Sequence, residues 1–117
     1  YHLANGGAQV VICRNRAYFA GITAREGAVT MAEQTADILA QYDALFAECG
    51  IEKKDLLNAN TFLSDMKVGD DYGAVWGKWI GDEYPPAGVC VQSRLPEGKL
   101  ISISMLAAVK QEEHHGY

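Results

Sequence analysis

The residues best suited to chemistry lie in a segment near the C-terminal end that begins with two prolines and closes with Arg-Leu-Pro. Side chains alternate between the two faces of a strand, so Gly88, Cys90 and Gln92 are expected to share one face. That face would offer a thiol, an amide and uncovered backbone, a combination suited to the wall of a small-molecule site. Val89 and Val91 would share the other face, and their apolar side chains predict that it belongs to the core.

Cys90 has two interpretations. It could act as a nucleophile or sensor if its pKa were lowered, because the thiolate is the reactive form of cysteine. The alternative is a packed and inert thiol, which is favoured because no His or Lys adjoins Cys90 in the sequence. The other cysteines, Cys13 and Cys49, form no Cys-x-x-Cys pair with it, so neither a disulfide framework nor a zinc site is expected.

The histidines, His2, His114 and His115, show no pattern typical of a metal site. The last two lie in a polar C-terminal tail, and adjacent histidines rarely converge on one ion without further ligands. We expect neither a metal nor a cofactor.

The charge pattern bears on the expected partners. The formal net charge is −5 and the ten lysines and arginines are scattered, so no basic stripe is available to bind phosphates. No nucleic-acid partner is expected. No apolar run approaches the roughly 18 residues of a membrane span, and the first residues lack the features of a signal peptide. We therefore expect no membrane association and a cytoplasmic location.

A chain of 117 residues is long enough for one core and too short for two, so a single domain over 1–117 is predicted. Its core is expected at about 8–110, with flexible ends at 1–7 and 111–117. The predicted order is strand, strand, helix, strand, helix, strand, strand. These elements are expected at 10–13, 16–22, 30–49, 56–63, about 65–80, 88–92 and 100–109.

The two helices differ in how clearly they are marked. Thr30 and Glu33 have the spacing of a capping box, and Gly50 stands where a left-handed C-terminal cap favours glycine. The second helix carries an apolar stripe that is typical of a core face: Tyr72, Val75, Trp76 and Trp79. Three glycines weaken this helix by propensity but would allow close packing against the sheet: Gly69, Gly73 and Gly77.

The alternation of strands and helices predicts an α+β fold. Two right-handed crossovers are expected to place both helices on one face of a mixed sheet. The other face would stay uncovered although its strands are apolar at many positions, among them Val11, Tyr18 and Leu57. Because a large exposed apolar surface indicates an interface, the sequence predicts a homo-oligomer that buries this face.

With these elements in order, the chain resembles the YjgF/Rid family of reactive-intermediate (enamine/imine) deaminases, some of which carry the label L-PSP endoribonuclease. The resemblance covers about 10–109 and rests on segments in the family's order and nearly at its spacing. They are Tyr18-Phe19-Ala20-Gly21, Gln34-Thr35, Thr61-Phe62-Leu63-Ser64-Asp65-Met66, Val75-Trp76, Trp79, Pro85-Pro86-Ala87, Cys90-Val91 and Arg94-Leu95-Pro96. The resemblance implies a chorismate-mutase-like fold and a homotrimer with three clefts between its subunits.

The resemblance also implies which residues line the cleft. In active members an arginine two residues before the cysteine binds a substrate carboxylate, and Gly88 stands there in this chain. A gap placed differently would put Ala87 opposite the arginine, again without a cation. A family glutamate on the last strand, thought to position the hydrolytic water, corresponds to Ser104.

Further cleft positions differ from the family as well. The serine before the strand-two glycine corresponds to Ala20, and the glutamate of the closing signature corresponds to Gln92. An N-terminal tyrosine of the cleft has no clear match and aligns at best with Gly7. The expected ligand-binding residues are therefore Ala20, Gly21, Gly88, Cys90, Gln92 and Ser104, with Cys90 and Ser104 as the catalytic candidates.

Three functions follow from this comparison. The first is a divergent member that binds a small metabolite in an intersubunit cleft and hydrolyses an enamine or imine other than the usual 2-imino acids. The second is a trimeric ligand-binding or regulatory protein that has no catalytic activity. The third is an endoribonuclease, which the net charge of −5 disfavours.

Overall fold

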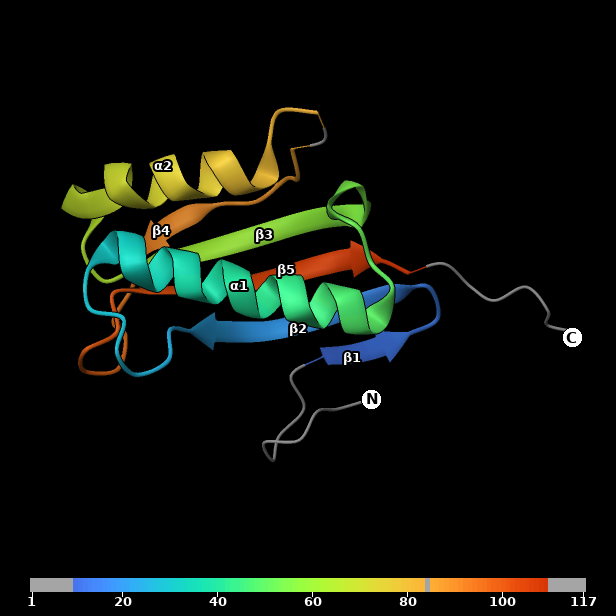
Figure 1. The fold of residues 1–117 in the computed structure, drawn as a ribbon, viewed down its shortest axis with the longest axis horizontal. Helices are drawn as coiled ribbons and strands as arrows, with labels where there is room; N and C mark the ends of the chain where they lie inside the picture. Colours follow the sequence, from blue (N-terminus) through green and yellow to red (C-terminus); the bar gives the residue numbers. More distant parts are fainter. Residues whose placement is uncertain (1–9, 84, 110–117) are drawn as a thin grey trace, which may run out of the picture.

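The structure of the protein is a computed structural model that describes residues 10–83 and 85–109, except for the side chain of residue 68. Figure 1 shows two helices lying along a five-stranded sheet. The strands are β1 (Val10–Cys13), β2 (Arg16–Thr23), β3 (Leu56–Leu63), β4 (Cys90–Gln92) and β5 (Ile101–Ala108), and the helices are α1 (Met31–Cys49) and α2 (Gly69–Ile80). Two short 3-10 helices, η1 (Lys53–Asp55) and η2 (Met66–Val68), flank β3. The predicted α+β class and element order are confirmed.

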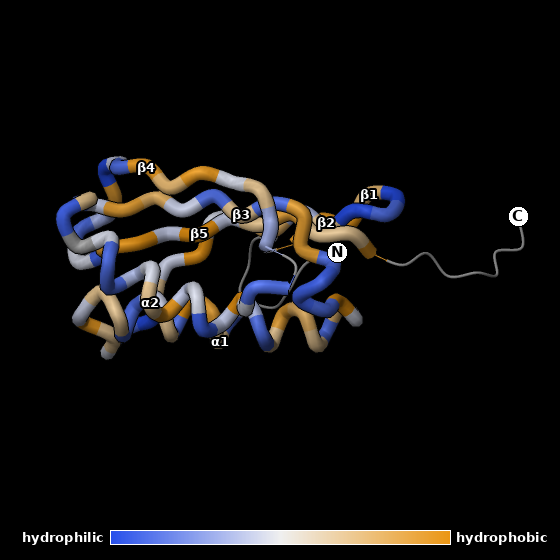
Figure 2. Tube along the Cα trace, turned by 90° about the horizontal axis from the view of Figure 1, so that it is seen from above, coloured by the Kyte–Doolittle hydropathy of each residue, from blue (hydrophilic) through white to orange (hydrophobic). Residues whose placement is uncertain are grey.

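The sheet is mixed and has the strand order β1-β2-β5-β3-β4. All neighbouring strands are antiparallel except β3 and β4, which are parallel. Both helices lie on the same side of the sheet, as predicted (Figure 2). The structure contains one chain, so the homotrimer stays a prediction.

The core lies between α1 and the middle of the sheet. Ile38, Tyr42 and Phe46 are buried on α1, and they face buried strand residues that include Phe19 and Ile103. The rings of Phe19 and Tyr42 meet edge to face with their centroids 5.5 Å apart, a favourable geometry for aromatic pairs.

The ends of α1 follow the predicted signals. The Glu33 amide donates to Thr30 Oγ1 at 3.1 Å, and the Thr30 amide donates to Glu33 Oε1 at 3.1 Å, which completes the capping box. At the other end Gly50 has a φ of 72°, the left-handed conformation expected of the cap.

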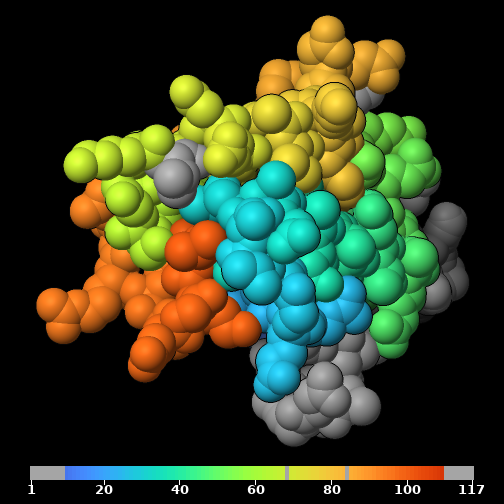
Figure 3. Space-filling view, turned by 60° about the vertical axis from the view of Figure 1, so that its left-hand side comes forward, coloured from blue at the N-terminus to red at the C-terminus, as the bar shows by residue number. Residues whose placement is uncertain are grey.

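A buried glutamine ties the start of α1 to the loop before β5. Gln34 Nε2 donates to the carbonyl of Gly98 at 3.0 Å, and the Leu100 amide donates to Gln34 Oε1 at 2.8 Å. Figure 3 shows this loop, in orange, lying against the first turns of α1, in cyan. The clamp fixes where β5 begins.

The second helix departs from its prediction in two respects. Its α-helical part begins at Gly69 rather than near 65, because η2 intervenes and the Asp65 carboxylate accepts from the Lys67 amide at 2.9 Å. None of its side chains is fully buried, so the aromatic stripe is only half covered. A Cβ at Gly73 or Gly77 would meet nothing within 4 Å, so the predicted close packing at these glycines is wrong.

The strand of the closing signature was placed correctly but predicted too long and too buried. β4 spans only Cys90–Gln92, and Val89 and Val91 are 56% and 41% exposed in the chain. The prediction that these valines belong to the core is therefore wrong for the single chain. Val91 is exposed because β4 is an edge strand, and because Val91 pairs with Phe62 on the face of the sheet that no helix covers.

Several expectations concern residues outside the described part of the chain. They are the flexible ends at 1–7 and 111–117, the match of Gly7 to a family tyrosine, and the three histidines.

Candidate functional site

A shallow pocket with a volume of about 180 Å³ lies where α2 runs beside β4 (Figure 1). It contains two of the predicted site residues, Gly88 and Cys90. Its lining consists of Ala59, Tyr72, Trp76, Pro86, Ala87, Gly88, Val89 and Cys90. We take this helix-side pocket as the candidate site.

Close backbone contact between β3 and the segment before β4 shapes the floor of the pocket. The Ala59 amide donates to the carbonyl of Ala87 at 2.9 Å, and the Thr61 amide donates to the carbonyl of Val89 at 2.8 Å. Between these bonds Gly88 has a φ of 152°, and a Cβ there would overlap the carbonyl oxygen of Ala59. The missing side chain of Gly88 therefore points at the backbone of β3, and the position is closed to an arginine without a shift of β4.

Cys90 faces the helices rather than the open side of the sheet. It pairs with Thr61, whose hydroxyl lies 3.0 Å from the Tyr72 hydroxyl, so the three side chains meet beneath α2. Burial raises the pKa of the Cys90 thiol. Burial also raises the pKa of Tyr72, the hydrogen bond to Thr61 opposes this shift, and the Cys90 sulfur adds a smaller increase. A nucleophilic Cys90 would instead need a lowered pKa, because the thiolate is the reactive form.

Gln92 shares the face of Cys90, as predicted, but it is engaged within the chain. Its Oε1 accepts from the Met66 amide at 3.0 Å, which anchors η2 to β4. Beyond it lies a second pocket of about 470 Å³ that is lined by Ser64, Gln92, Ser93, Arg94 and Leu95. The arginine of the closing signature thus lines a different pocket from Cys90.

The remaining predicted site residues lie on the other face of the sheet. Between the pairs Phe19–Met105 and Ile22–Ile103 the register shifts, so Ala20 and Gly21 oppose the single residue Ser104 in a β-bulge. Ala20 and Gly21 are exposed and Ser104 is half-buried. A Cβ at Gly21 would lie 3.0 Å from the hydroxyl of Ser102, so little room separates the two strands here.

A buried tyrosine supports this bulge from the helix side. Tyr42 is fully buried, and its hydroxyl donates to the carbonyl of Ile103 at 2.8 Å and lies 3.2 Å from the carbonyl of Ala20. A β-bulge leaves backbone groups without a hydrogen-bond partner on the neighbouring strand. The Tyr42 hydroxyl reaches two backbone carbonyls at this bulge. The bulge is therefore held from beneath by α1.

The six predicted ligand-binding residues fall into two groups that one chain does not bring together. Gly88, Cys90 and Gln92 lie at the β4 edge, and Ala20, Gly21 and Ser104 lie at the bulge on the helix-free face. Their roles stay predictions.

Two residues of the pocket were not predicted as site residues. Tyr72 and Trp76 belong to the stripe that was interpreted as core, and they are only half-buried. Nothing in the sequence distinguishes them from core aromatics, because their exposure results from the outlying position of α2.

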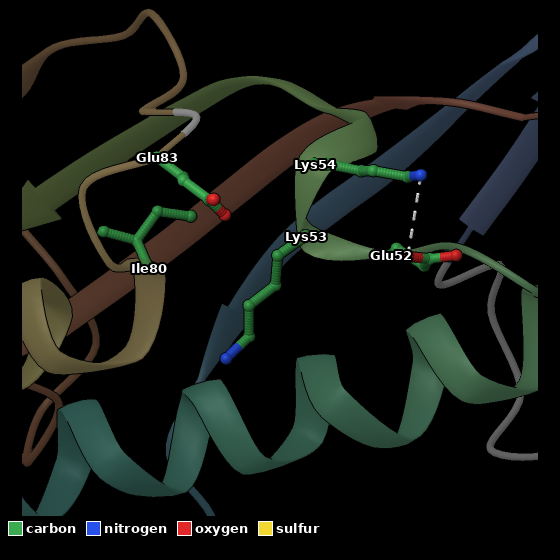
Figure 4. A pocket seen from close by; sticks show the side chains of 5 residues that line it. All are labelled: Glu52, Lys53, Lys54, Ile80 and Glu83. Atoms are coloured by element: carbon green, nitrogen blue, oxygen red, sulfur yellow. Dashed lines mark ion pairs between the residues drawn. The ribbon is translucent and has the colours of Figure 1, made fainter.

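A third pocket, of about 300 Å³, lies between the end of α2 and η1 and is lined by Glu52, Lys53, Lys54, Ile80 and Glu83 (Figure 4). Lys53 Nζ donates to the carbonyl of Trp79 at 2.7 Å and lies 4.4 Å from the centre of its ring. Lys54 pairs with Glu52 at 3.9 Å. The Lys53 contact lies at the C-terminal end of α2, where a cation complements the helix dipole.

Within 10–83 and 85–109, no group of three or more His, Cys, Asp or Glu residues could hold a metal ion. No helix in the same ranges is long and apolar enough to cross a membrane.

Comparisons with known proteins agree on one family. A family model described as Endoribonuclease L-PSP matches residues 4–109. The chain is 34% identical over 93 residues to a RutC family protein of Haemophilus influenzae, covering 76% of this chain and 78% of that protein. It is 34% identical over 101 residues to the RutC family protein YoaB of Escherichia coli K12, covering 86% and 88%.

Solved structures show the same relationship. A YjgF family member from Neisseria meningitidis superposes with a TM-score of 0.86 at 32% identity, covering 94% of this chain and 92% of that one. A putative translation initiation inhibitor from Salmonella typhimurium superposes with a TM-score of 0.80 at 32% identity, covering 86% and 87%.

Proposed function

This chain belongs to the YjgF/Rid family, whose family model is described as Endoribonuclease L-PSP, and we propose that it is a divergent member that binds a small metabolite in a cleft between subunits. In this proposal it hydrolyses an enamine or imine other than the usual 2-imino acids. The observation that carries the proposal is the pocket beside Cys90, which has the position of the family's closing signature but no arginine. A cytoplasmic location stays a prediction.

The conformation of Gly88 supports divergence from the usual substrates. A bidentate arginine is the common way to anchor a carboxylate, and this backbone leaves no space for a side chain at Gly88. Losing a charge-assisted hydrogen bond costs about 1.5–3 kcal/mol, or roughly ten- to hundredfold in binding. A carboxylate-bearing imine would therefore bind weakly in this pocket.

The separation of the predicted site residues supports a cleft between subunits. The pocket at β4 and the bulge at Ser104 lie on opposite faces of the sheet, so only a second chain could bring such groups to one ligand. The helix-free face also carries exposed apolar side chains, which include Val11, Tyr18 and Val91. Homotrimeric assembly is part of the proposal.

Released ammonia measures the reaction. We expect the purified protein to turn over 2-iminopropionate at least about tenfold more slowly than a family member with the signature arginine. A neutral imine of similar size should lose much less activity in the same comparison. Equal rates on 2-iminopropionate would contradict the proposal, because they would show that the carboxylate is anchored without the arginine.

A ligand-binding protein without catalysis is the alternative, and three observations favour it. The pKa of Cys90 is raised, Gln92 accepts a hydrogen bond from the Met66 amide, and none of the described residues that line the pocket carries a carboxylate. If it is correct, a metabolite that raises the melting temperature will not be consumed. Iodoacetamide will then modify Cys90 slowly at neutral pH although the residue is exposed, because burial raises the pKa of its thiol.

An endoribonuclease is the least supported candidate. The net charge is −5, and the described lining of the pocket beside Cys90 holds no basic side chain, whereas RNA binding draws on phosphate contacts by Lys and Arg. We expect highly purified protein to leave single-stranded RNA intact, as judged by gel electrophoresis.

A further inference from the structure

The described residues that line the pocket beside Cys90 carry no charge. These eight residues include no Lys, Arg, His, Asp or Glu. Their two titratable groups are the Tyr72 hydroxyl and the Cys90 thiol, and burial raises the pKa of each, which favours the neutral forms. A charged ligand would lose its hydration here and find no opposite charge in return.

One wall of the pocket is aromatic and the opposite wall is backbone. Tyr72 and Trp76 are stacked with their rings inclined by 28° and their centroids 6.2 Å apart. The other wall is the chain from Pro86 to Cys90, which is held flat against β3 by the bonds to Ala59 and Thr61. Such a slot suits a flat ring, which could stack on Trp76.

The polar groups that border the slot are neutral as well. Ala87 and Val89 direct their carbonyls to β3. Backbone groups alternate between the two sides of a strand, so those of Gly88 and Cys90 face the outer edge of the sheet. In the described part of the chain no strand lies beyond β4, so these amides and carbonyls have no ladder partner there.

The size of the pocket limits the ligand to about one ring. Its volume is about 180 Å³. An apolar cavity of roughly 150 Å³ is known to accept a benzene molecule, so one six-membered ring with a small substituent would fit.

We propose that this pocket binds a planar, uncharged aromatic molecule whose ring stacks on Trp76 and whose neutral carbonyl, amide or imine group meets the backbone at Gly88 and Cys90. The inference rests on the proposed ligand-binding role of this pocket and names its ligand class. It differs from a carboxylate-binding site, because Arg94, the arginine that follows β4 in the chain, lines the separate pocket beyond Gln92.

Three small probes test this ligand class by isothermal titration on the full 117-residue chain. Benzamide is flat, aromatic and neutral, benzoate replaces its amide with a charge, and isobutyramide replaces its ring with a branched alkyl group. We expect benzamide to bind at least tenfold more tightly than either of the others. Benzoate binding as tightly as benzamide, or isobutyramide doing so, would overturn the inference.

Variants locate the binding. Trp76→Leu should weaken benzamide binding at least tenfold, and Trp76→Phe, which keeps a ring, should stay within about threefold. Trp79→Phe is the matched control, since Trp79 is the second tryptophan of α2 and does not line the pocket. It also leaves Trp76 as the only tryptophan, so quenching of its fluorescence by benzamide reports stacking directly. Unchanged fluorescence on saturation would refute stacking on Trp76 even if Trp76→Leu failed to fold.

The outcomes separate this inference from the proposed function. If 2-iminopropionate or benzoate binds better than benzamide, and Trp76→Leu weakens that binding, the pocket binds a metabolite but the ligand class is wrong. If no probe binds and no imine is hydrolysed, both proposals fail.

Discussion

Gly88 is the residue at which the structure changes the interpretation of the sequence most. The family resemblance places Gly88 where active members have an arginine that binds the substrate carboxylate. That correspondence suggests that an arginine introduced at this position would restore carboxylate binding. The backbone indicates the opposite, because a Cβ at Gly88 would overlap the carbonyl of Ala59. In this chain the backbone before β4 lies too close to β3 to admit a side chain at this position.

Substitution of Gly88 should therefore destabilise the protein. We expect Gly88→Ala and Gly88→Arg to lower the free energy of unfolding by at least about 2 kcal/mol, measured by urea denaturation. Gly73→Ala is the matched control, because Gly73 lies in α2 with open space around it and alanine favours helix by about 0.5–1 kcal/mol. A stable Gly88→Arg protein with raised affinity for carboxylates would show that β4 can move away from β3.

The sequence correctly predicted some of the residues of the candidate site. Gly88 and Cys90 were predicted together and do line one pocket, because alternation along a strand is a local property. Ser104 and Ala20 were assigned from the resemblance and lie on the other face of the sheet. Tyr72 and Trp76 were missed because their exposure depends on how far α2 lies from the core, which the helical spacing does not encode.

At the scale of elements, α1 was predictable because its signals are local. The capping box and Gly50 fix its ends within a few residues of chain, and its buried stripe needs only the helical period. β4 was less predictable, because its length and burial depend on being an edge strand. The valines on either side of Cys90 look like core residues and become surface residues for this reason.

The ion pair between Arg25 and Asp37 should make the stability of the protein depend on pH. Arg25, before α1, forks onto Asp37 within it, with the shortest nitrogen–oxygen distance at 2.8 Å. The hydrogen bond from Arg25 lowers the pKa of Asp37 to about 2. A carboxyl group whose pKa is lowered by folding stabilises the protein above its unfolded pKa of about 3.9. That contribution is lost as the pH falls from about 4 to about 2.

Asp37→Asn should remove this part of the pH dependence. We expect the variant to be less stable than the wild type at pH 6 and the difference to shrink steadily between about pH 4 and pH 2, as followed by urea denaturation at each pH. Asp71→Asn, on an exposed position of α2, is the control for loss of a negative charge. A difference that is constant with pH would mean that the Arg25 contact does not favour the ionised carboxyl.

At the scale of the whole molecule, the sheet has one covered face and one open face. The helices cover the first (Figure 2), whereas the second carries Val11, Tyr18 and Val91, each between 41% and 49% exposed. Half-buried Phe62 and Leu106 lie among them, since they pair with Val91 and Tyr18. Contiguous apolar surface of this kind marks interaction sites in soluble proteins.

The open face should therefore hold the proposed homotrimer together. We expect light scattering to give a mass of about 38 kDa, three times the 12.7 kDa of one chain. Val91→Glu should shift the protein toward monomer, because burying an unpaired carboxylate costs several kcal/mol at each interface. Val29→Glu is the matched control, since Val29 is 70% exposed but precedes α1, away from this face. If light scattering shows the wild type to be a monomer at micromolar concentration, the trimer is refuted. If Val91→Glu and the wild type have equal masses, the subunit interface lies elsewhere on the molecule.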